Sequence, residues 1–170
     1  MKNIGLFYGS DTGTTEMISE QIINLIGKKN VTKHDIFDTK VSDFENYNCI
    51  ILGLSTWYDG ELQSDWDSFF EEFQTIDFKN KKVAIFGIGD QYSYADTFID
   101  GVGIIGKVVK TNNGILIGEW STDGYFHDSS VAELEMGTFC GLAIDEDNQS
   151  DMTAERLKKW TKQILTEFTQ

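Results

Sequence analysis

The segment IGLFYGSDTGTTE, residues 4–16, places a run of apolar residues directly before a turn rich in glycine and hydroxyl groups. The run 3–8 is nearly all apolar, which is typical of a strand covered on both faces. Residues 14–28 follow with helical spacing, and one side of this helix is expected to carry Met17, Ile18, Ile22, Leu25 and Ile26. A strand that passes directly into a helix is the repeating unit of a parallel α/β sheet.

The same alternation continues along the chain. Further strands are predicted at residues 31–37, 49–54, 82–87, 115–119 and 139–144, and helices at 41–46, 65–74, 95–110 and 153–168, the last with Thr153 as N-cap. This order predicts a doubly wound parallel sheet with helices on both faces, which binds ligands beyond the carboxyl ends of its strands. The sequence shows no repeat or linker, so we expect a single domain over residues 1–170.

Composition excludes several classes of partner. The net charge is −14, which disfavours nucleic acid and anionic membranes and suits a partner protein with a basic docking face. No apolar run approaches the length of a membrane span and no signal peptide precedes the first strand, so we expect a cytoplasmic protein. Cys49 and Cys140 lie in apolar runs and are expected to be buried thiols.

The first turn has the composition of a phosphate-binding loop without a cation. No lysine follows Gly13, so the loop does not match the pattern that binds nucleoside triphosphates. It can offer the unpaired N–H groups of a helix start and the hydroxyls of Ser10, Thr12, Thr14 and Thr15, which suffice for one phosphate monoester. The alternative is an ordinary strand-to-helix turn with a threonine N-cap.

Two further loops carry aromatic residues where strands end. STWYDGELQ, residues 55–63, contains Trp57 and Tyr58, and GIGDQYSYADTF, residues 87–98, contains Tyr92 and Tyr94. Because these loops follow neighbouring strands, they should meet the first turn at one crevice, where two aromatic rings could enclose a planar ligand. The glycines of the third loop would let backbone amides reach its edge. The alternative is that Trp57 folds back onto the core.

Other motifs point to no site. Gly101, Gly103 and Gly106 spell a dinucleotide-binding pattern, but they fall inside a predicted helix, where close packing on the sheet explains them better. His34 and His127 are isolated, and residues 145–151 lack the spacing of a calcium loop, so no metal site is predicted. No nucleophile, base and acid are grouped as catalysis would need.

Five segments together resemble the long-chain flavodoxins: IGLFYGSDTGTTE, STWYDGELQSDWD, FGIGDQYSYAD, EWSTDGY and GLAIDEDNQS, in that order over essentially the whole chain. This resemblance implies an FMN-containing electron carrier with a five-stranded parallel sheet of order 2-1-3-4-5. It also implies that residues from about 120 to 137 interrupt the last strand. Six strand-like runs would then form five strands.

The resemblance also implies the residues that contact the cofactor. The whole set is Ser10, Asp11, Thr12, Gly13, Thr14, Thr15, Ser55, Thr56, Trp57, Tyr58, Asp59, Gly60, Gly89, Asp90, Tyr94, Thr97, Ile99 and Asp147. Residues 10–15 would hold the phosphate, with the Asp11 side chain pointing away from it. Trp57 and Tyr94 would flank the ring, and Thr97 and Ile99 would offer it backbone groups. The other positions lie on segments that contact the ribityl chain or the ring edge.

The peptide between Tyr58 and Asp59 would lie beside flavin N5. In flavodoxins a backbone flip there lets a carbonyl accept the N5 proton of the one-electron-reduced form. Neither residue is glycine, so we expect this flip to be hindered.

The expected function is a low-potential carrier of single electrons that shuttles FMN between semiquinone and hydroquinone. Reduced flavin is an anion, and six carboxylates are expected near the crevice, each opposing it by roughly 1 kcal/mol: Asp59, Glu61, Asp65, Asp67, Asp90 and Asp96. By resemblance, the expected electron donor is ferredoxin–NADP reductase. The chain itself is expected to be a monomer and not an enzyme. The alternative is an FMN-dependent NAD(P)H:quinone reductase. A phosphorelay receiver domain is not expected, because this chain lacks the phosphoacceptor aspartate that such a domain needs.

Overall fold

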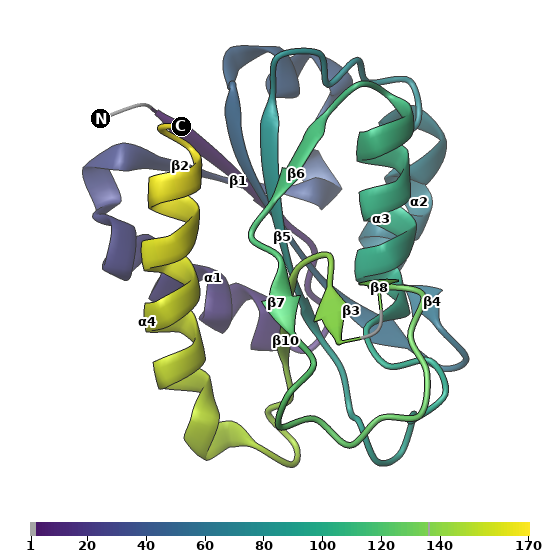
Figure 1. Cartoon of the computed structure of the whole chain (residues 1–170). Helices are drawn as coiled ribbons and strands as arrows, with labels where there is room; N and C mark the ends of the chain where they lie inside the picture. The colour runs from purple at the N-terminus through teal and green to yellow at the C-terminus, as the bar shows by residue number, and fades with distance from the viewer. Residues whose placement is uncertain (1–2, 136) are drawn as a thin grey trace.

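A computed structural model of the chain describes residues 3–135 and 137–170. Its centre is a parallel sheet in which β1 (Ile4–Tyr8) lies between β2 (Val31–Asp35) and β3 (Cys49–Trp57), and β3 in turn pairs with β5 (Lys82–Ile88). The spatial order is β2, β1, β3, β5 and then β6 with β10, which together form one interrupted strand. Numbered along the chain as five strands, this is the predicted order 2-1-3-4-5. Figure 1 shows this sheet edge-on between two layers of helices.

The last strand is interrupted, as predicted. Its first part, β6 (Ile115–Ile117), pairs with residues 82–84 of β5, and its second part, β10 (Leu142–Ile144), pairs with residues 86–88. Between the two parts, β7 (Trp120–Ser121), β8 (Glu133–Glu135) and β9 (Thr138–Phe139) form a small antiparallel sheet. Residues 118–141 therefore leave the main sheet and return to it beside the same neighbour.

Two helices cover each face of the sheet. On one face α1 (Thr14–Ile26) packs against α4 (Ser150–Glu167), and on the other lie α2 (Ser64–Phe73) and α3 (Asp100–Thr111). Neighbouring strand residues point to opposite faces, so Leu6 belongs to the core under α1 and α4, whereas Phe7 belongs to the core under α2 and α3. Both cysteines are buried, as predicted.

Several predicted helix features need correction. Helix α3 begins at Asp100 rather than at residue 95, because residues 90–98 form successive turns and the Ala95 carbonyl accepts hydrogen bonds from the N–H groups of Asp128 and Ser129. Helix α4 begins at Ser150, so Thr153 is not its N-cap; its hydroxyl donates to Glu146 instead. On α1, Met17 and Leu25 are exposed, since the buried side runs through Ile18, Ile22 and Ile26 together with Ile23.

Segments predicted as strand ends or loops also differ. Strand β3 continues through Trp57 and forms a hairpin with β4 (Glu61–Leu62), in which Thr56 lies opposite Leu62. The predicted strand 31–37 ends at Asp35, and 139–144 divides into β9 and β10. The described residues also form the 3-10 helices η1 (Lys28–Asn30), η2 (Ile36–Asp38) and η3 (Val41–Asn46), the last with the bounds expected for the short helix. Within the described ranges, no helix has both the length and the apolarity needed to cross a bilayer.

Candidate functional site

The three predicted loops meet at one crevice of about 290 Å³ at the carboxyl ends of the central strands. Its lining combines hydroxyl, aromatic and acidic side chains: Thr12, Thr14, Ser55, Thr56, Trp57, Tyr58, Ile88, Gly89, Asp90, Tyr94, Glu146 and Asp147. Such a mixture can enclose a flat ring and also bind a polar chain. Ile88 and Glu146 were not predicted. Glu146 lies two residues after the end of the last strand, beside the predicted Asp147, so its position was a usable signal.

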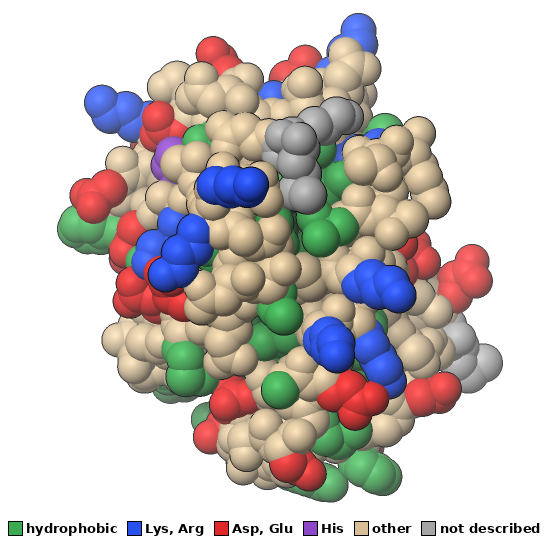
Figure 2. All heavy atoms as spheres, turned by 90° about the vertical axis from the view of Figure 1, so that its left-hand side faces the viewer, with side chains coloured by type: hydrophobic (Ala, Val, Ile, Leu, Met, Phe, Trp, Pro, Cys, Tyr) green, Lys and Arg blue, Asp and Glu red, His purple; other side chains and the backbone are tan. Residues whose placement is uncertain are grey.

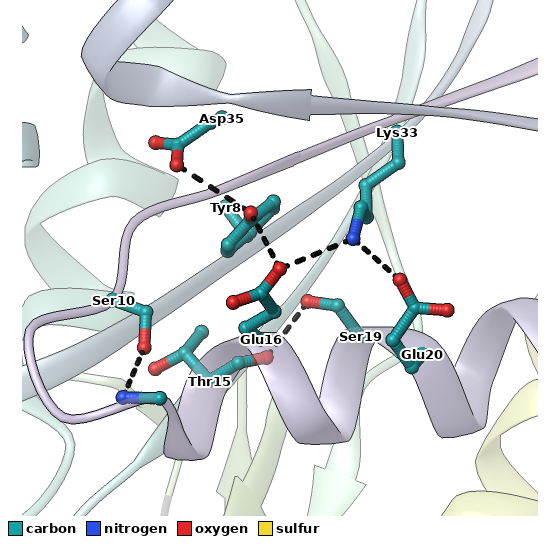
Figure 3. A network of polar contacts seen from close by, with 9 residues as sticks. Tyr8, Ser10, Thr15, Glu16, Ser19, Glu20, Lys33 and Asp35 are labelled. Carbon is teal, nitrogen blue, oxygen red and sulfur yellow. Dashed lines mark hydrogen bonds and ion pairs between the residues drawn. The ribbon is translucent and has the colours of Figure 1, made fainter.

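The first loop turns at Gly13, whose backbone is left-handed with φ of 90°. A Cβ at Gly13 would meet nothing within 4 Å, so backbone conformation rather than crowding requires glycine there. The Ser10 hydroxyl accepts a hydrogen bond of 3.0 Å from the Gly13 N–H (Figure 3), and the hydroxyls of Thr12 and Thr14 lie 3.4 Å apart. In the described part of the chain, no side chain caps α1. The start of this helix is thus suited to an anion.

Asp11 belongs to the same loop but its carboxylate contacts the start of α2. It accepts hydrogen bonds of 2.6 Å from the Ser64 hydroxyl and 3.0 Å from the Gln63 amide. Gln63 is buried and its Oε1 accepts a hydrogen bond from the Trp66 N–H. The Asp11 carboxylate therefore fastens the loop to α2; its direction relative to a bound phosphate stays a prediction.

Trp57 and Tyr94 line the crevice from different loops. Trp57 is half-buried and its indole Nε1 donates to the Ser55 hydroxyl at 3.1 Å, so it does not fold back into the core. Tyr94 is 45% exposed, an open position for so large an apolar ring. Rings left this exposed at a crevice are available to stack on a planar ligand.

The turn between β3 and β4 has an unusual backbone. Tyr58 has φ of 46° and Gly60 has φ of 87°. A left-handed conformation costs a non-glycine residue about 1–2 kcal/mol, so the surrounding contacts must hold Tyr58 there. A Cβ at Gly60 would lie 2.7 Å from Oδ2 of Asp100, a buried carboxylate at the start of α3. The other oxygen of Asp100 accepts a 2.8 Å hydrogen bond from the Val131 N–H, and burial raises the pKa of this carboxyl.

Asp90 organises the third loop. Its carboxylate accepts hydrogen bonds from the N–H groups of Tyr92 at 3.1 Å and Ser93 at 2.9 Å, and from the Asn148 amide at 2.8 Å. Partial burial opposes its ionisation, but these hydrogen bonds outweigh burial and lower the pKa of Asp90. Gly89 lines the crevice, and its own N–H is engaged within the protein, donating to the Ile144 carbonyl.

The predicted acidic residues do not all lie at the crevice. Asp90 lines the crevice, whereas Glu61 and Asp67 line a neighbouring groove of about 690 Å³ on the far side of Trp57 and Tyr58. Asp65 is not at the crevice: it accepts a 2.8 Å hydrogen bond from Gln63 and lines a hollow beside η2. Asp59 and Asp96 are exposed. The carboxylates that do line the crevice are Asp90, Glu146 and Asp147.

Some predicted contact residues lie outside the crevice lining. Ile99 is fully buried with φ of 49°, and the Thr97 N–H donates to the Tyr94 carbonyl. Thr15 is buried beneath the first loop. Ser10, Asp11, Gly13, Asp59 and Gly60 also lie outside the lining and shape the loops around it. Their direct contact with a ligand stays a prediction.

The glycine pattern in α3 serves close packing, but only in part on the sheet as predicted: a Cβ at Gly101 would lie 3.0 Å from Leu54 of β3, whereas Gly103 faces the insertion. A Cβ at Gly103 would lie 2.4 Å from the backbone of Val131, and one at Gly106 would lie 3.2 Å from the Cys140 sulfur. Over residues 3–135 and 137–170, no group of three or more His, Cys, Asp or Glu side chains is placed to hold a metal ion.

Comparison with known proteins agrees with this geometry. A protein-family model described as flavodoxin matches residues 6–160. A flavodoxin of Haemophilus influenzae is 48% identical over 168 residues, covering 99% of this chain and 97% of the relative. One of Trichodesmium erythraeum is 49% identical over 170 residues, 99% of each. The solved structure of Fusobacterium nucleatum flavodoxin bound to flavin mononucleotide has a TM-score of 0.93, with 33% identity and 99% of both chains covered. Since the family model spans most of the chain and the relatives are nearly half identical along its length, this chain belongs to the flavodoxin family.

Proposed function

We propose that this chain binds one FMN non-covalently in the crevice and carries single electrons at low potential between redox enzymes, without a substrate of its own. One observation carries the proposal: Trp57 and Tyr94 line the same crevice as Thr12 and Thr14 at the start of α1, whose loop contains no lysine or arginine. Bound FMN supplies one-electron redox chemistry, and the protein sets its energy. The Fusobacterium nucleatum relative, whose structure contains flavin mononucleotide, supports the choice of ligand.

The residues present fit FMN. The loop over residues 10–15 offers backbone N–H groups and hydroxyls for a phosphate monoester, and the two aromatic residues can lie against a ring. Thr56 is held by its own contact, since its Oγ1 accepts a 3.0 Å hydrogen bond from the Gly101 N–H. The chain's part is to orient the ring and to exclude water from it with Trp57 and Tyr94.

The charge of the crevice favours low potential. Asp90, Glu146 and Asp147 line it, and the lowered pKa of Asp90 keeps that carboxylate ionised at neutral pH. Each near-surface carboxylate opposes further negative charge in the crevice by about 1 kcal/mol. An acidic rim also suits a partner with a basic face, such as a ferredoxin–NADP reductase. The proposal also includes a monomeric, single-domain, cytoplasmic protein of the long-chain group. The interruption of the last strand between β6 and β10 supports the assignment to the long-chain group.

Reconstitution and reductive titration test this function. The apoprotein should bind one equivalent of FMN, and the visible spectrum should pass through two separable one-electron steps during reduction, the second at low potential. Failure to bind FMN would end the proposal. Sustained oxidation of NADPH by quinone at catalytic protein concentration would favour the quinone reductase instead.

A matched pair of tyrosines in the third loop tests the placement of the ring. Tyr94 lines the crevice, whereas Tyr92 is exposed outside it and stacks on Phe126 with ring centroids 6.2 Å apart. Tyr94→Ala should weaken FMN binding by about tenfold, because one ring face loses its aromatic contact. Tyr92→Ala should leave the affinity unchanged. Equal losses in the two variants would contradict this placement.

A further inference from the structure

Glu16 occupies a position that competes with an anion at the start of α1. It is the third residue of the helix and its acidic residue in the first turn. A glutamate at this position commonly reaches back and accepts a hydrogen bond from an N–H group at the helix start. In a loop without lysine or arginine, those N–H groups are what a phosphate would need. Glu16 could therefore block the site from within the same helix.

The structure directs Glu16 elsewhere. Figure 3 shows its carboxylate turned from the loop toward two strands of the sheet, where Oε1 lies 3.2 Å from the Tyr8 hydroxyl of β1 and 3.3 Å from Nζ of Lys33 in β2. The side chain of Glu16 is 49% exposed, so packing alone does not hold it there. These two contacts determine its direction.

Lys33 is the centre of this network. Its Nζ contacts Glu16 and also Glu20, one turn further along α1, and lies 5.4 Å from the centroid of the Tyr8 ring. The hydrogen bond to Glu20 raises the pKa of Lys33, so the amine remains a cation at neutral pH. A single cation on β2 therefore pairs with two carboxylates of α1.

Tyr8 remains a neutral donor. Burial, together with the nearby charges of Asp35 and Glu16, raises the pKa of the hydroxyl to about 12. Asp35 lies 3.4 Å from the same hydroxyl and also caps η2 by accepting from the Phe37 N–H. Different oxygens of Asp35 face Phe37 and Tyr8, and Glu16 Oε1, at 3.2 Å, is the nearer of the two acceptors for the one Tyr8 proton.

We propose that Lys33 and Tyr8 are positioning residues for phosphate binding, which hold the Glu16 carboxylate away from the N–H groups at the start of α1. This inference rests on the proposed function, because it concerns the phosphate of FMN. The network allows an acidic residue in the first turn of α1 to coexist with a bound phosphate. Lys33 would thus support phosphate binding by pairing with Glu16, and not by contacting the phosphate itself.

Removing the cation should weaken phosphate recognition specifically. In Lys33→Met the Glu16 carboxylate is free to turn toward the helix start, where it competes with the phosphate and repels it. FMN affinity of the apoprotein should fall by about two- to fivefold, the range of first-turn charge effects and exposed ion pairs. Riboflavin has the same ring and ribityl chain without the phosphate, so its affinity should not change. Flavin fluorescence quenching measures both.

A second substitution separates this mechanism from direct attraction. In Lys33→Met combined with Glu16→Ala, FMN affinity should equal that of Glu16→Ala alone, because the competitor is gone. Glu20 is the matched control: it pairs with the same lysine but lies beyond the first turn. Lys33→Met combined with Glu20→Ala should stay as weak as Lys33→Met, and Lys33→Arg should bind FMN like the unaltered chain.

Two results would overturn the inference while leaving the proposed function intact. One is an FMN affinity unaffected by Lys33→Met. The other is an equal loss whether or not Glu16 is present, which would mean that Lys33 attracts the phosphate directly. Equal weakening of riboflavin and FMN would indicate a general structural loss and would also contradict it. If the unaltered apoprotein fails to bind FMN at all, the proposed function itself is wrong, and the inference with it.

Discussion

Gly13 and Gly60 have almost the same left-handed φ, 90° and 87°, but different surroundings. A Cβ at Gly13 would project into open space, whereas one at Gly60 would lie 2.7 Å from the Asp100 carboxylate. Gly13→Ala should therefore cost only the backbone strain, about 1 kcal/mol, and Gly60→Ala about 2–3 kcal/mol. Urea unfolding of the two apoproteins measures the difference. Equal losses would mean that Asp100 moves aside without cost.

Asp100 gives a prediction about pH at the same scale. Its folded-state pKa is raised by burial, so over the range between its unfolded and folded pKa the native protein binds more protons, and stability falls as pH rises. Asp100→Asn keeps an acceptor for the Val131 N–H and does not titrate. Its stability relative to the unaltered chain should increase as pH rises from about 4, near the unfolded pKa of an aspartate, towards neutrality, as measured by urea unfolding. Asp96→Asn removes one exposed aspartate in the same way and is the matched variant for the loss of a charge.

At the scale of elements, one buried arginine joins the insertion to α4. Arg156 is 5% exposed, and its guanidinium lies 4.1 Å from the centroid of the Tyr125 ring. The Tyr125 hydroxyl donates to the Ala143 carbonyl of β10 at 2.6 Å and accepts from the Trp120 indole of β7 at 3.0 Å. The arginine thus packs on the ring that joins the insertion to the main sheet.

Arg156→Ala should destabilise the apoprotein by about 2–3 kcal/mol, because it removes both the cation–π contact and the packing of the side-chain stem. Arg156→Met keeps part of the packing and should lose less. Lys158→Ala, two positions along the same helix but exposed, should change stability by less than about 0.5 kcal/mol. Thermal or urea unfolding provides the comparison; an Arg156→Ala protein as stable as the Lys158→Ala protein would contradict the coupling.

At the scale of the whole molecule, charge is unevenly distributed. The net charge of the chain is −14. Figure 2 shows basic side chains among the acidic ones on the side that carries α1 and α4. Helix α4 contains the exposed residues Lys158, Lys159 and Lys162. The crevice rim and the adjoining groove instead have carboxylates at Asp90, Glu61 and Asp67. This distribution favours approach of a basic partner from the crevice side.

Association with such a partner should therefore slow by at least about tenfold between about 0.05 and 0.5 M salt, as measured by stopped flow. Glu61→Gln combined with Asp67→Asn should slow it at low salt. Lys158→Gln combined with Lys162→Gln changes the net charge by the same magnitude in the opposite direction, on the other face of the sheet, and should not slow it. Association that does not depend on salt would remove electrostatic steering from the proposal.

The main features of the fold and the crevice could be predicted because they depend on local pattern. Runs such as residues 82–87 are apolar throughout, and parallel strands bring their carboxyl ends to one edge, so the sequence alone sufficed to place Thr12, Trp57 and Tyr94 together. The start of α3 could not be predicted, since the turns at residues 90–98 are held by hydrogen bonds from Asp128 and Ser129 of the insertion. Asp65 was misplaced for a local reason: the amide of Gln63, two residues before it, holds its carboxylate on another side of α2.

By itself the sequence determined the alternation of strands and helices, the hydroxyl-rich turn without a cation and the aromatic residues at the strand ends, because each follows from neighbouring residues. Only the tertiary structure decided which distant groups meet. Asp100 touches Gly60, Arg156 covers Tyr125 and Lys33 draws Glu16 from the helix start, in each case across elements far apart along the chain. The physical reason is that hydrophobic periodicity is a property of the sequence of one helix or strand, whereas polar partners depend on how different elements pack against one another.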